Sequence, residues 1–562
     1  MSAPLTDTST TPASAAIDAF RALRTEVLED CYRRQPTLST YLGMHQHDAS
    51  LEDYSAEAVA DEIAAARGFQ SRLEAIAPAE LPADDRVDRQ QLILSLESAV
   101  LRADVIRPWT TSPDLYSSGL TNSAYALVKR EFAPAEERLA ALVTRLRAMP
   151  AALDHARRNL DVPPRVYTEL AIEQLDGNRA FFEAAVPQAF ASVDRPSLQA
   201  EFRRANRAVI EALTAYKTWL RDTLLPRSRG PFACGAEAYR RRLWADEMVD
   251  TSLDELLAMA EADLAQNRRA FEETARRIDP SRSTAEVLAE IERHRPRADE
   301  LISTTQAELD ALAAFLADHD IVTLPADSPV QVKETPPFLR ATTSASIEVP
   351  GPFEQVATEA YYNMTLPDPA WPEAEREDFM RQWYYAAITN VSVHEVWPGH
   401  HLQFLHVRTL SSDVRRVLGV ASNVEGWAHY AEQMVLDEGF HAEDPRYRIA
   451  QLQDALLRDV RFVVGIRMHT QGMSVAEAEQ FFRTEAHQTP HVARVEARRG
   501  TFDATYGYYT LGKLMVLKLR DEYKAAIGPA YTLRGFHDAF LQAGPLPLPL
   551  VRETIMRGLA RP

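Results

Sequence analysis

The sequence predicts a mostly α-helical protein with one small β-sheet, and two observations support this fold class. Apolar residues recur at spacings of three and four over most of the chain, which is the period of a helix with one buried face. The exception lies between residues 321 and 367, where Pro, Thr, Val and aromatic residues are frequent and short extended pieces interrupt the helical pattern. A chain of 562 residues can bury a large core around such elements.

The first part of the chain is expected to be a short tail followed by a helical lobe. Residues 1–13 are rich in Ser, Thr, Ala and Pro, so we expect a disordered tail. Residues 14–320 follow the helical pattern nearly throughout. Two helix starts carry the pattern in which a Ser hydroxyl and a Glu carboxylate satisfy free N–H groups reciprocally, namely Ser252-x-x-Glu255 and Ser283-x-x-Glu286.

The second part, residues 321–562, begins with the predicted sheet. Residues 321–367 hold its extended pieces, of which 343–349 and 357–365 are the clearest. Proline residues are expected at the edges of this sheet, where a missing N–H costs least. After Pro372 the helical pattern returns and continues to the end of the chain.

Charge and composition exclude several classes of function. The formal net charge is −19, which argues against nucleic acid and against anionic membrane surfaces as partners. The only two cysteines, Cys31 and Cys234, rule out a disulfide scaffold. The first residues show neither a basic region nor an apolar stretch, and no window approaches the roughly 18 apolar residues of a membrane span. We therefore expect a cytoplasmic protein, and the oligomeric state stays open.

The pattern that points to chemistry is His394-Glu395 followed by His400 and His401. Two imidazoles can hold a zinc ion while the Glu beside the first of them handles a water proton. In the usual motif the second His follows four residues after the first, but here that position holds Pro398. In a regular helix, His394 and His400 would lie about 9 Å apart along the axis and about 120° apart around it.

The helix must therefore be distorted between the two histidines if both bind one ion. Pro398 lacks an N–H and crowds the carbonyl of residue 394, and Gly399 tolerates unusual backbone angles. A kink or bulged turn there would shorten the path from His394 to His400. The alternative interpretation is a surface helix that ends at Trp-Pro-Gly with its histidines in solvent.

A second segment offers the third ligand that zinc sites of this type take from a later helix. Glu425 lies in Ser422-Asn-Val-Glu-Gly-Trp-Ala-His-Tyr-Ala-Glu432, at the expected distance along the chain. Metal-bound imidazoles usually donate their second N–H to a carboxylate, which Glu432 could supply. His429 and Glu432 could equally be a pair on the surface of an amphipathic helix.

The two segments together resemble one family. His394-Glu-x-x-Pro-Gly-His-His-Leu-Gln followed by Glu425-Gly-Trp-Ala-x-Tyr-x-Glu is similar to the bacterial family called domain of unknown function 885. That family in turn resembles helical gluzincin metallopeptidases such as thimet oligopeptidase, carboxypeptidase Taq and dipeptidyl peptidase III. The similarity extends over most of the chain and is strongest from Glu334 onward. It implies a large two-lobed metallopeptidase-like fold with the sheet next to the zinc helix, and it favours His400 over His401 as second ligand.

The resemblance implies further positions. The strand Tyr361-Tyr-Asn-Met-Thr fits one that in such peptidases aligns an extended substrate by edge pairing. A late Tyr or His in these enzymes stabilises the oxyanion, and the candidates here are Tyr509, Tyr506 and His469, with Tyr508 also open. The sequence departs from the family around these residues. Gly465 and Arg467 replace the usual Asp and Gly, and Asp503-Ala-Thr-Tyr506 replaces Pro-Gly-Gln-Ala.

Two other motif interpretations fail. Gly507-Tyr-Tyr-Thr-Leu-Gly512-Lys513 matches the spacing of a phosphate-binding loop, but Leu514 follows where Ser or Thr should bind magnesium. The chain also lacks the Gly-x-Ser-x-Gly sequence of many serine hydrolases.

The sequence thus predicts a zinc-dependent metallopeptidase with one zinc ion held by His394, His400 and Glu425. Glu395 would act as general base on the water that attacks a peptide carbonyl, and the substrate would be a short peptide in a cleft. One alternative is a zinc hydrolase of a non-peptide amide or ester. Another is a catalytically silent helical binding protein with a degenerate metal site.

Overall fold

A computed structural model describes residues 12–325, 329–335 and 343–559. Within them the protein is mostly helical, with one three-stranded sheet, as the sequence predicts. Of the expected tail, residues 1–11 lie outside the described residues, and the first helix begins at Pro12. No helix among the described residues is long and apolar enough to cross a membrane.

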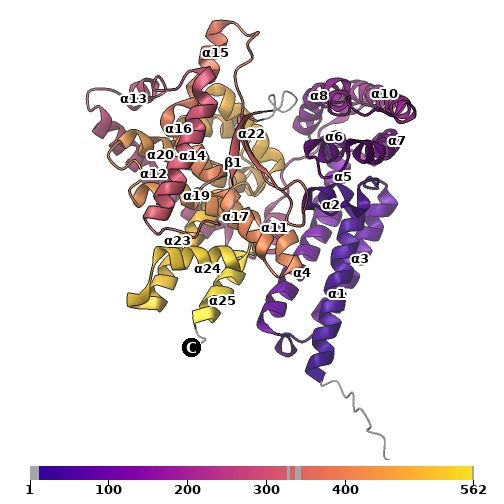
Figure 1. Cartoon of the computed structure of the whole chain (residues 1–562), viewed down its shortest axis with the longest axis horizontal. Helices are drawn as coiled ribbons and strands as arrows, with labels where there is room; N and C mark the ends of the chain where they lie inside the picture. The colour runs from indigo at the N-terminus through magenta and orange to yellow at the C-terminus, as the bar shows by residue number, and fades with distance from the viewer. Residues whose placement is uncertain (1–11, 326–328, 336–342, 560–562) are drawn as a thin grey trace, which may run out of the picture.

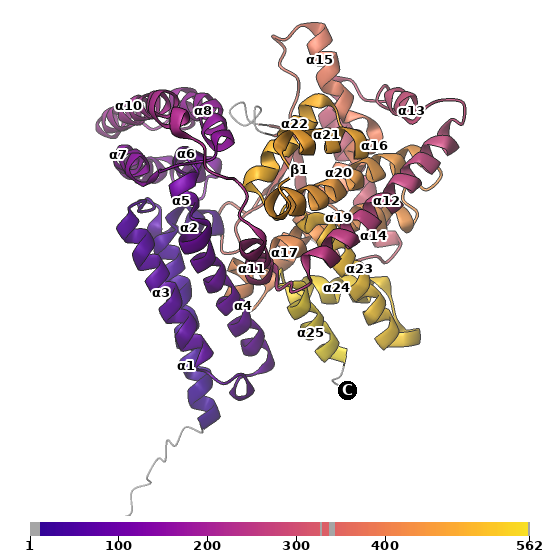
Figure 2. The same cartoon turned by 180° about the vertical axis from the view of Figure 1, so that it is seen from behind.

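Figures 1 and 2 show the helices up to α10 gathered on one side of the molecule and most later helices on the other. The first group has two apolar cores: α6, α7, α8 and α10 pack around one that includes Leu120, Leu142 and Phe182, while α1, α3 and α4 pack around another that includes Phe20, Leu73 and Leu92. Its helices are α1 (Pro12–Arg34), α2 (Pro36–Leu42), α3 (Ala56–Glu74), α4 (Ala83–Val100), α5 (Pro108–Thr111), α6 (Asp114–Lys129), α7 (Ala135–Asn159), α8 (Arg165–Ala180), α9 (Val186–Ala189) and α10 (Pro196–Trp219).

The next four helices pack against elements far along the chain. They are α11 (Ala236–Glu247), α12 (Leu253–Ile278), α13 (Thr284–Ile291) and α14 (Leu301–Asp318). α12 lies along α20, and α11 packs on α4 as well as on α20. Both predicted capping boxes are present: Ser252 and Ser283 each accept a bond from the third helical N–H and receive a carboxylate in return. The division of the chain at residue 320 stays a prediction.

The sheet consists of β1 (Val330–Glu334), β2 (Ala345–Glu348) and β3 (Ala360–Met364) in the order β1-β3-β2. β3 is parallel to β1 and antiparallel to β2, with Ile347 opposite Tyr362. Since β3 is the central strand, its two edges are already paired. The expectation that the Tyr361 strand aligns a substrate along its edge is therefore wrong, and among the described residues the unpaired strand edge near the helices belongs to β2.

The remaining helices carry the motifs singled out in the sequence. They are α15 (Glu373–Met380), α16 (Tyr385–Glu395), α17 (His400–Thr409), α18 (Asp413–Val417), α19 (Ala421–Asp437), α20 (Pro445–Thr470), α21 (Val475–Glu485), α22 (Pro490–Phe502), α23 (Tyr508–Ile527), α24 (Leu533–Ala543) and α25 (Leu548–Leu559). α19 packs closely on both α16 and α23. Lys513, in the rejected phosphate-loop pattern, lies inside α23, where its ammonium is buried 2.8 Å from Oδ2 of Asp263.

Candidate metal centre

The chain breaks its helix between the two histidines of the motif. α16 ends at Glu395 and α17 begins at His400, with a cis bond between Trp397 and Pro398. The N–H of Gly399 donates to the carbonyl of Val393 at 3.0 Å, which folds the connection back on the helix end. A Cβ atom at Gly399 would lie 1.9 Å from the carbonyl oxygen of His394, so only glycine fits there. The predicted break at Pro398-Gly399 is confirmed.

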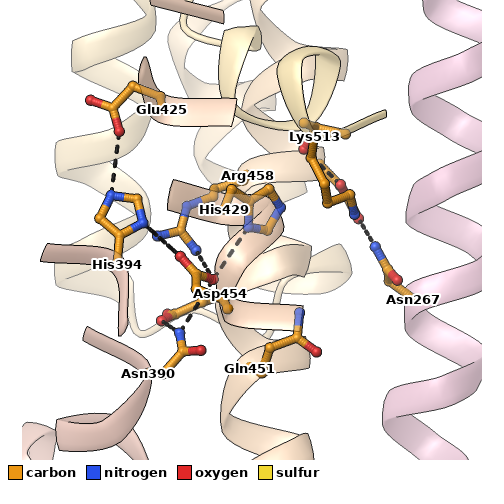
Figure 3. A network of polar contacts seen from close by, with 12 residues as sticks. Asn267, Asn390, His394, Glu425, His429, Gln451, Asp454, Arg458 and Lys513 are labelled. Carbon is orange, nitrogen blue, oxygen red and sulfur yellow. Dashed lines mark hydrogen bonds and ion pairs between the residues drawn. The ribbon is translucent and has the colours of Figure 1, made fainter. Parts of the chain in front are cut away.

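The break brings His394 and His400 to the same place as Glu425 from α19. Their ligand atoms all lie within 4.8 Å of one another. Nε2 of His394 is 3.3 Å and Nε2 of His400 is 3.4 Å from Oε2 of Glu425. Figure 3 shows the Glu425 carboxylate facing the His394 ring. His401 is not part of this cluster, because its ring packs edge-on against Trp397 with centroids 4.8 Å apart.

Two features of the cluster fit a bound cation. The buried Oε2 of Glu425 lies between two imidazoles yet has no hydrogen bond of good geometry in the described structure. Burial alone would raise the pKa of Glu425, but His394 and His400 outweigh it and hold that pKa well below its usual value. Two imidazole nitrogens and one carboxylate oxygen are a zinc donor set that leaves one position open.

A buried polar network lies behind His394, on the side away from Glu425 (Figure 3). Nδ1 of His394 is 2.7 Å from Oε1 of Glu432, which is fully buried in α19. Arg458 from α20 holds both oxygens of that carboxylate, at 3.0 Å and 3.1 Å. His429 completes the set, with Nδ1 3.2 Å from Oε2 of Glu432. The network fixes the orientation of the His394 ring.

The electrostatics of this network separate its two histidines. Burial opposes a charge on His394, but bonds to Glu425 and Glu432 raise its pKa to about 9. Burial lowers the pKa of His429 to about 3, despite the neighbouring Glu432. Burial would also raise the pKa of Glu432, yet the charge of Arg458, together with hydrogen bonds from His394 and His429, holds it far below its usual value. Glu432 is therefore an anion that His394 faces at neutral pH.

Glu395, the predicted general base, points to the sheet. Its Oε2 accepts a hydrogen bond from the backbone N–H of Ile347 at 3.2 Å. Ile347 lies in β2. The carbonyl of Ser344, three residues earlier, accepts a bond from Thr365 on the β3 side, and backbone groups alternate in direction along a strand, so the N–H of Ile347 points away from β3. Glu395 thus lies at the free edge of the sheet and next to the first metal-cluster residue.

Tyr509 is the late tyrosine that the structure brings to the cluster. Its ring centroid is 6.4 Å from that of His394, and the guanidinium groups of Arg461 and Arg458 lie 5.1 Å and 5.6 Å from it. Burial, and after it the charge of Glu425, raises the pKa of Tyr509, so its hydroxyl stays protonated at neutral pH. Tyr508 stacks on Tyr509, with its hydroxyl 3.3 Å from Asp503.

The other two late candidates lie elsewhere. Tyr506 is fully buried, and its ring packs where Cβ atoms on Gly465 and Gly500 would reach it. His469 lies in the last turn of α20, with Nε2 2.7 Å from the carbonyl oxygen of Gly500 and Nδ1 3.3 Å from the backbone nitrogen of Cys234. Neither has a described contact with the metal cluster. Tyr509, whose ring lies beside that of His394, is therefore the late candidate at this site.

Glycine at two crossing points allows α19 and α23 to touch. A Cβ atom at Gly426 would lie 2.5 Å from the Cα of Gly512, and one at Gly512 would lie 1.9 Å from the carbonyl oxygen of Ser422. Glu425 is next to Gly426 in the chain, and Tyr509 lies about one turn before Gly512, so the crossing brings the backbone of both residues close together. The resemblance singled out both glycine-containing segments, but not their contact with each other.

Two positioning residues carried no signal in the sequence. Arg458 lies on a long helix among other arginines, and only the fold shows that it holds Glu432. Glu247, at the end of α11, accepts a bond from the N–H of Ser422 at 3.0 Å and so caps the helix that carries Glu425. Helix N-caps are usually local in sequence, and this one comes from 175 residues away.

Two solved structures resemble the whole chain. A candidate lipoprotein of unknown function from Shewanella oneidensis shares 24% of residues over 96% of this chain and 99% of its own, with a TM-score of 0.80. A candidate lipoprotein from Colwellia psychrerythraea shares 18% over 97% and 99%, with a TM-score of 0.82. At these identities the likeness shows a common fold. No curated protein matches the chain in sequence.

The names of these neighbours overturn one expectation. Lipoproteins are held at membranes by their lipid anchors, and both neighbours carry that description. The expectation of a cytoplasmic location conflicts with this finding, and we withdraw it. The family itself is shown by sequence: residues 36–555 match the family described as bacterial protein of unknown function, DUF885. The chain therefore belongs to the DUF885 family.

Proposed function

We propose that the protein is a zinc-dependent metallopeptidase that hydrolyses short peptides. The observation that carries this proposal is the convergence of His394, His400 and Glu425 within 4.8 Å, with Glu395 directly beside the first histidine. Bound there, zinc would supply a Lewis acid that polarises a carbonyl and acidifies water. The resemblance of both motifs to helical gluzincin peptidases, and the grouping of the helices on two sides, support the same two-lobed metallopeptidase-like interpretation.

The protein's own residues have distinct tasks in this proposal. Glu395 takes a proton from the attacking water and passes it to the leaving amine. Glu432, fixed by Arg458, accepts a hydrogen bond from the Nδ1–H of His394 and leaves Nε2 free to bind the ion. The hydroxyl of Tyr509 donates to the oxygen on which negative charge develops.

The free edge of β2 favours a peptide over a small amide or ester. An extended peptide can add to such an edge through main-chain hydrogen bonds. Ile347, whose N–H points outward, lies within hydrogen-bond distance of Glu395. The edge that would align the substrate therefore lies beside the group that would move its protons.

The test is metal analysis of the purified protein, followed by cleavage of a mixed peptide pool with and without a chelator. We expect one zinc ion per chain and cleavage that the chelator abolishes. Glu395→Gln should keep the zinc and lose hydrolysis, while Glu375→Gln, an exposed Glu on α15, should leave both unchanged. Cleavage of small amides or esters alone would favour a non-peptide hydrolase. Absence of stoichiometric zinc would favour a silent binding protein.

A further inference from the structure

Lys129, at the end of α6, is a largely buried cation with no carboxylate within 4 Å in the described part of the chain. Its ammonium lies 5.8 Å from the ring centroid of Tyr41 and 5.9 Å from that of Tyr125. Burial lowers the pKa of Lys129, against the attraction of Glu348. Charged groups that proteins bury are normally paired, because desolvation of a lone charge is costly. This cation is poised to take an anion from outside the chain.

Arg130, the next residue, adds a second positive charge. Its Nη1 donates to the carbonyls of Ala357 and Glu359 at 2.9 Å each, and its Nε lies 3.4 Å from Oε1 of Glu348. Its Nη2 is buried without a hydrogen-bond partner among the described residues. Two cations thus face a single carboxylate. We call Tyr41, Tyr125, Lys129, Arg130 and Glu348 the cationic pocket.

The cationic pocket lies at one end of the free strand edge. Glu348 is the last residue of β2 and follows Ile347, whose N–H binds Glu395. Consecutive Cα atoms are about 3.8 Å apart, so Glu348 lies one residue along the strand from the backbone N–H that binds Glu395. The charge of Glu348 also reaches the hydroxyls of Tyr41 and Tyr125, where burial first and Glu348 second raise the pKa of each.

The opposite end of β2 opens into a groove of about 990 Å³. Ser344 and Ala345 border it, together with the α16 face of Ala387 and Val391 that leads toward His394. Its lining carries both signs of charge, with Arg381 bound to Glu292 at 3.1 Å. One end of the strand edge therefore borders a groove with both signs of charge, while two cations and one carboxylate lie at the other end.

We propose that the cationic pocket binds the terminal carboxylate of a peptide substrate, with Lys129 as the residue that selects it. The peptide would lie along β2, with its body in the groove and its scissile bond one or two residues from its C-terminus. The ammonium of Lys129 and the free Nη2 of Arg130 would donate charge-assisted hydrogen bonds to the carboxylate. This inference rests on the proposed peptidase function and names its substrate class: peptides with a free C-terminus.

Binding to the inactive Glu395→Gln protein tests the inference without turnover. With zinc added, titration calorimetry compares one short peptide as its free acid and as its C-terminal amide. The free acid should bind about 10- to 100-fold more tightly, the range for a hydrogen bond to a charged group. Adding Lys129→Met should abolish that difference, and adding Lys129→Arg should keep it. Lys518→Met, which removes an exposed lysine from α23, should change nothing.

Two results would overturn the inference. Equal affinities for the free acid and the C-terminal amide would show that the pocket does not recognise the carboxylate. If N-terminal acetylation weakens peptide binding and C-terminal amidation does not, the strand end binds the peptide's amine through Glu348. Thermal unfolding of each variant checks that it is folded. If Lys129→Met does not fold, the Lys129→Arg protein, which keeps the charge, still has to prefer the free acid. Peptide binding without any hydrolysis by the wild-type protein would instead defeat the proposed function alone.

Discussion

Nδ1 of His394 lies 2.7 Å from a fully buried oxygen of Glu432, on the side of the ring opposite Glu425. In the neutral ring that a bound metal ion requires, this bond places the one proton on Nδ1. With Nδ1 bonded to Glu432, only Nε2 can offer a lone pair to a cation. Arg458 holds Glu432 in turn, so the orientation of the imidazole depends on a chain of three side chains from α16, α19 and α20.

Glu432→Gln should weaken zinc binding by about 10- to 100-fold, because the amide accepts the Nδ1 proton less strongly and loses its ion pair with Arg458. Competition with a chromophoric chelator measures the change. Glu438→Gln, at an exposed position just after α19, is the control and should bind zinc as the wild-type protein does. Unchanged affinity in Glu432→Gln would remove Glu432 from the metal centre.

His400→Ala and His401→Ala should have opposite effects on metal content. His400 belongs to the cluster, so its loss should bring zinc below one ion per chain after dialysis. His401 packs on Trp397, and its loss should lower the unfolding temperature while zinc stays bound. Elemental analysis and thermal unfolding of the two proteins read out both effects. Loss of zinc in His401→Ala alone would exchange the two assignments.

Tyr509→Phe should lower kcat by about 10²- to 10³-fold, the usual cost of removing one donor to an oxyanion. Tyr506→Phe should leave kcat unchanged, since its hydroxyl is buried away from the cluster and has no hydrogen-bond partner in the described structure. Steady-state kinetics on one peptide measures both variants. A loss of kcat in Tyr506→Phe with none in Tyr509→Phe would contradict this assignment.

Gly512→Ala should destabilise the protein by at least about 1–3 kcal/mol, the usual cost of overpacking. The added methyl group would lie 1.9 Å from the carbonyl oxygen of Ser422, and this backbone atom cannot move aside as a flexible side chain could. Gly177→Ala in α8 is the matched control, because a Cβ atom there meets nothing within 4 Å. It should be neutral or stabilising by up to about 1 kcal/mol. Urea unfolding compares the two, and equal stabilities would refute the close contact.

Glu247→Gln should change how stability depends on pH. Burial raises the pKa of Glu247 to about 7, although Ser422 opposes the shift. The folded pKa exceeds the unfolded one, so this stabilising contribution is complete below pH 4.5 and is lost as pH rises through 7. Relative to wild type, Glu247→Gln should therefore gain up to about 3 kcal/mol between pH 5 and pH 8. Urea unfolding at both values measures this gain, with exposed Glu237→Gln as control; a constant difference would contradict it.

Local signals in the sequence predicted local structure well. The capping boxes at Ser252 and Ser283 are present because each involves four consecutive residues and needs no tertiary partner. The break at Pro398-Gly399 is present for the same reason: proline and glycine act on the backbone where they stand. The two segments that hold the metal cluster could be singled out because each carries its ligand residues within a few positions.

Long-range pairing could not be predicted in this way. Nothing in Tyr361-Tyr-Asn-Met-Thr shows that β3 is central, because strand order depends on which distant segments pair. The same holds for Arg458 and Glu247, whose partners lie 26 and 175 residues away. Arginine and glutamate on helices are normally solvent-exposed, so burial of these two follows from tertiary packing alone.

The backbone contact between Gly426 and Gly512 lets the metal centre tolerate substitutions of nearby side chains. Main chain touches main chain at that crossing, so the spacing of the two helices that carry the carboxylate ligand and the tyrosine does not depend on the side chains between them. An engineer could exchange side chains along β2 or in the groove to recruit new substrates while the reacting groups keep their alignment. A single methyl group added at the same crossing would push the two helices apart.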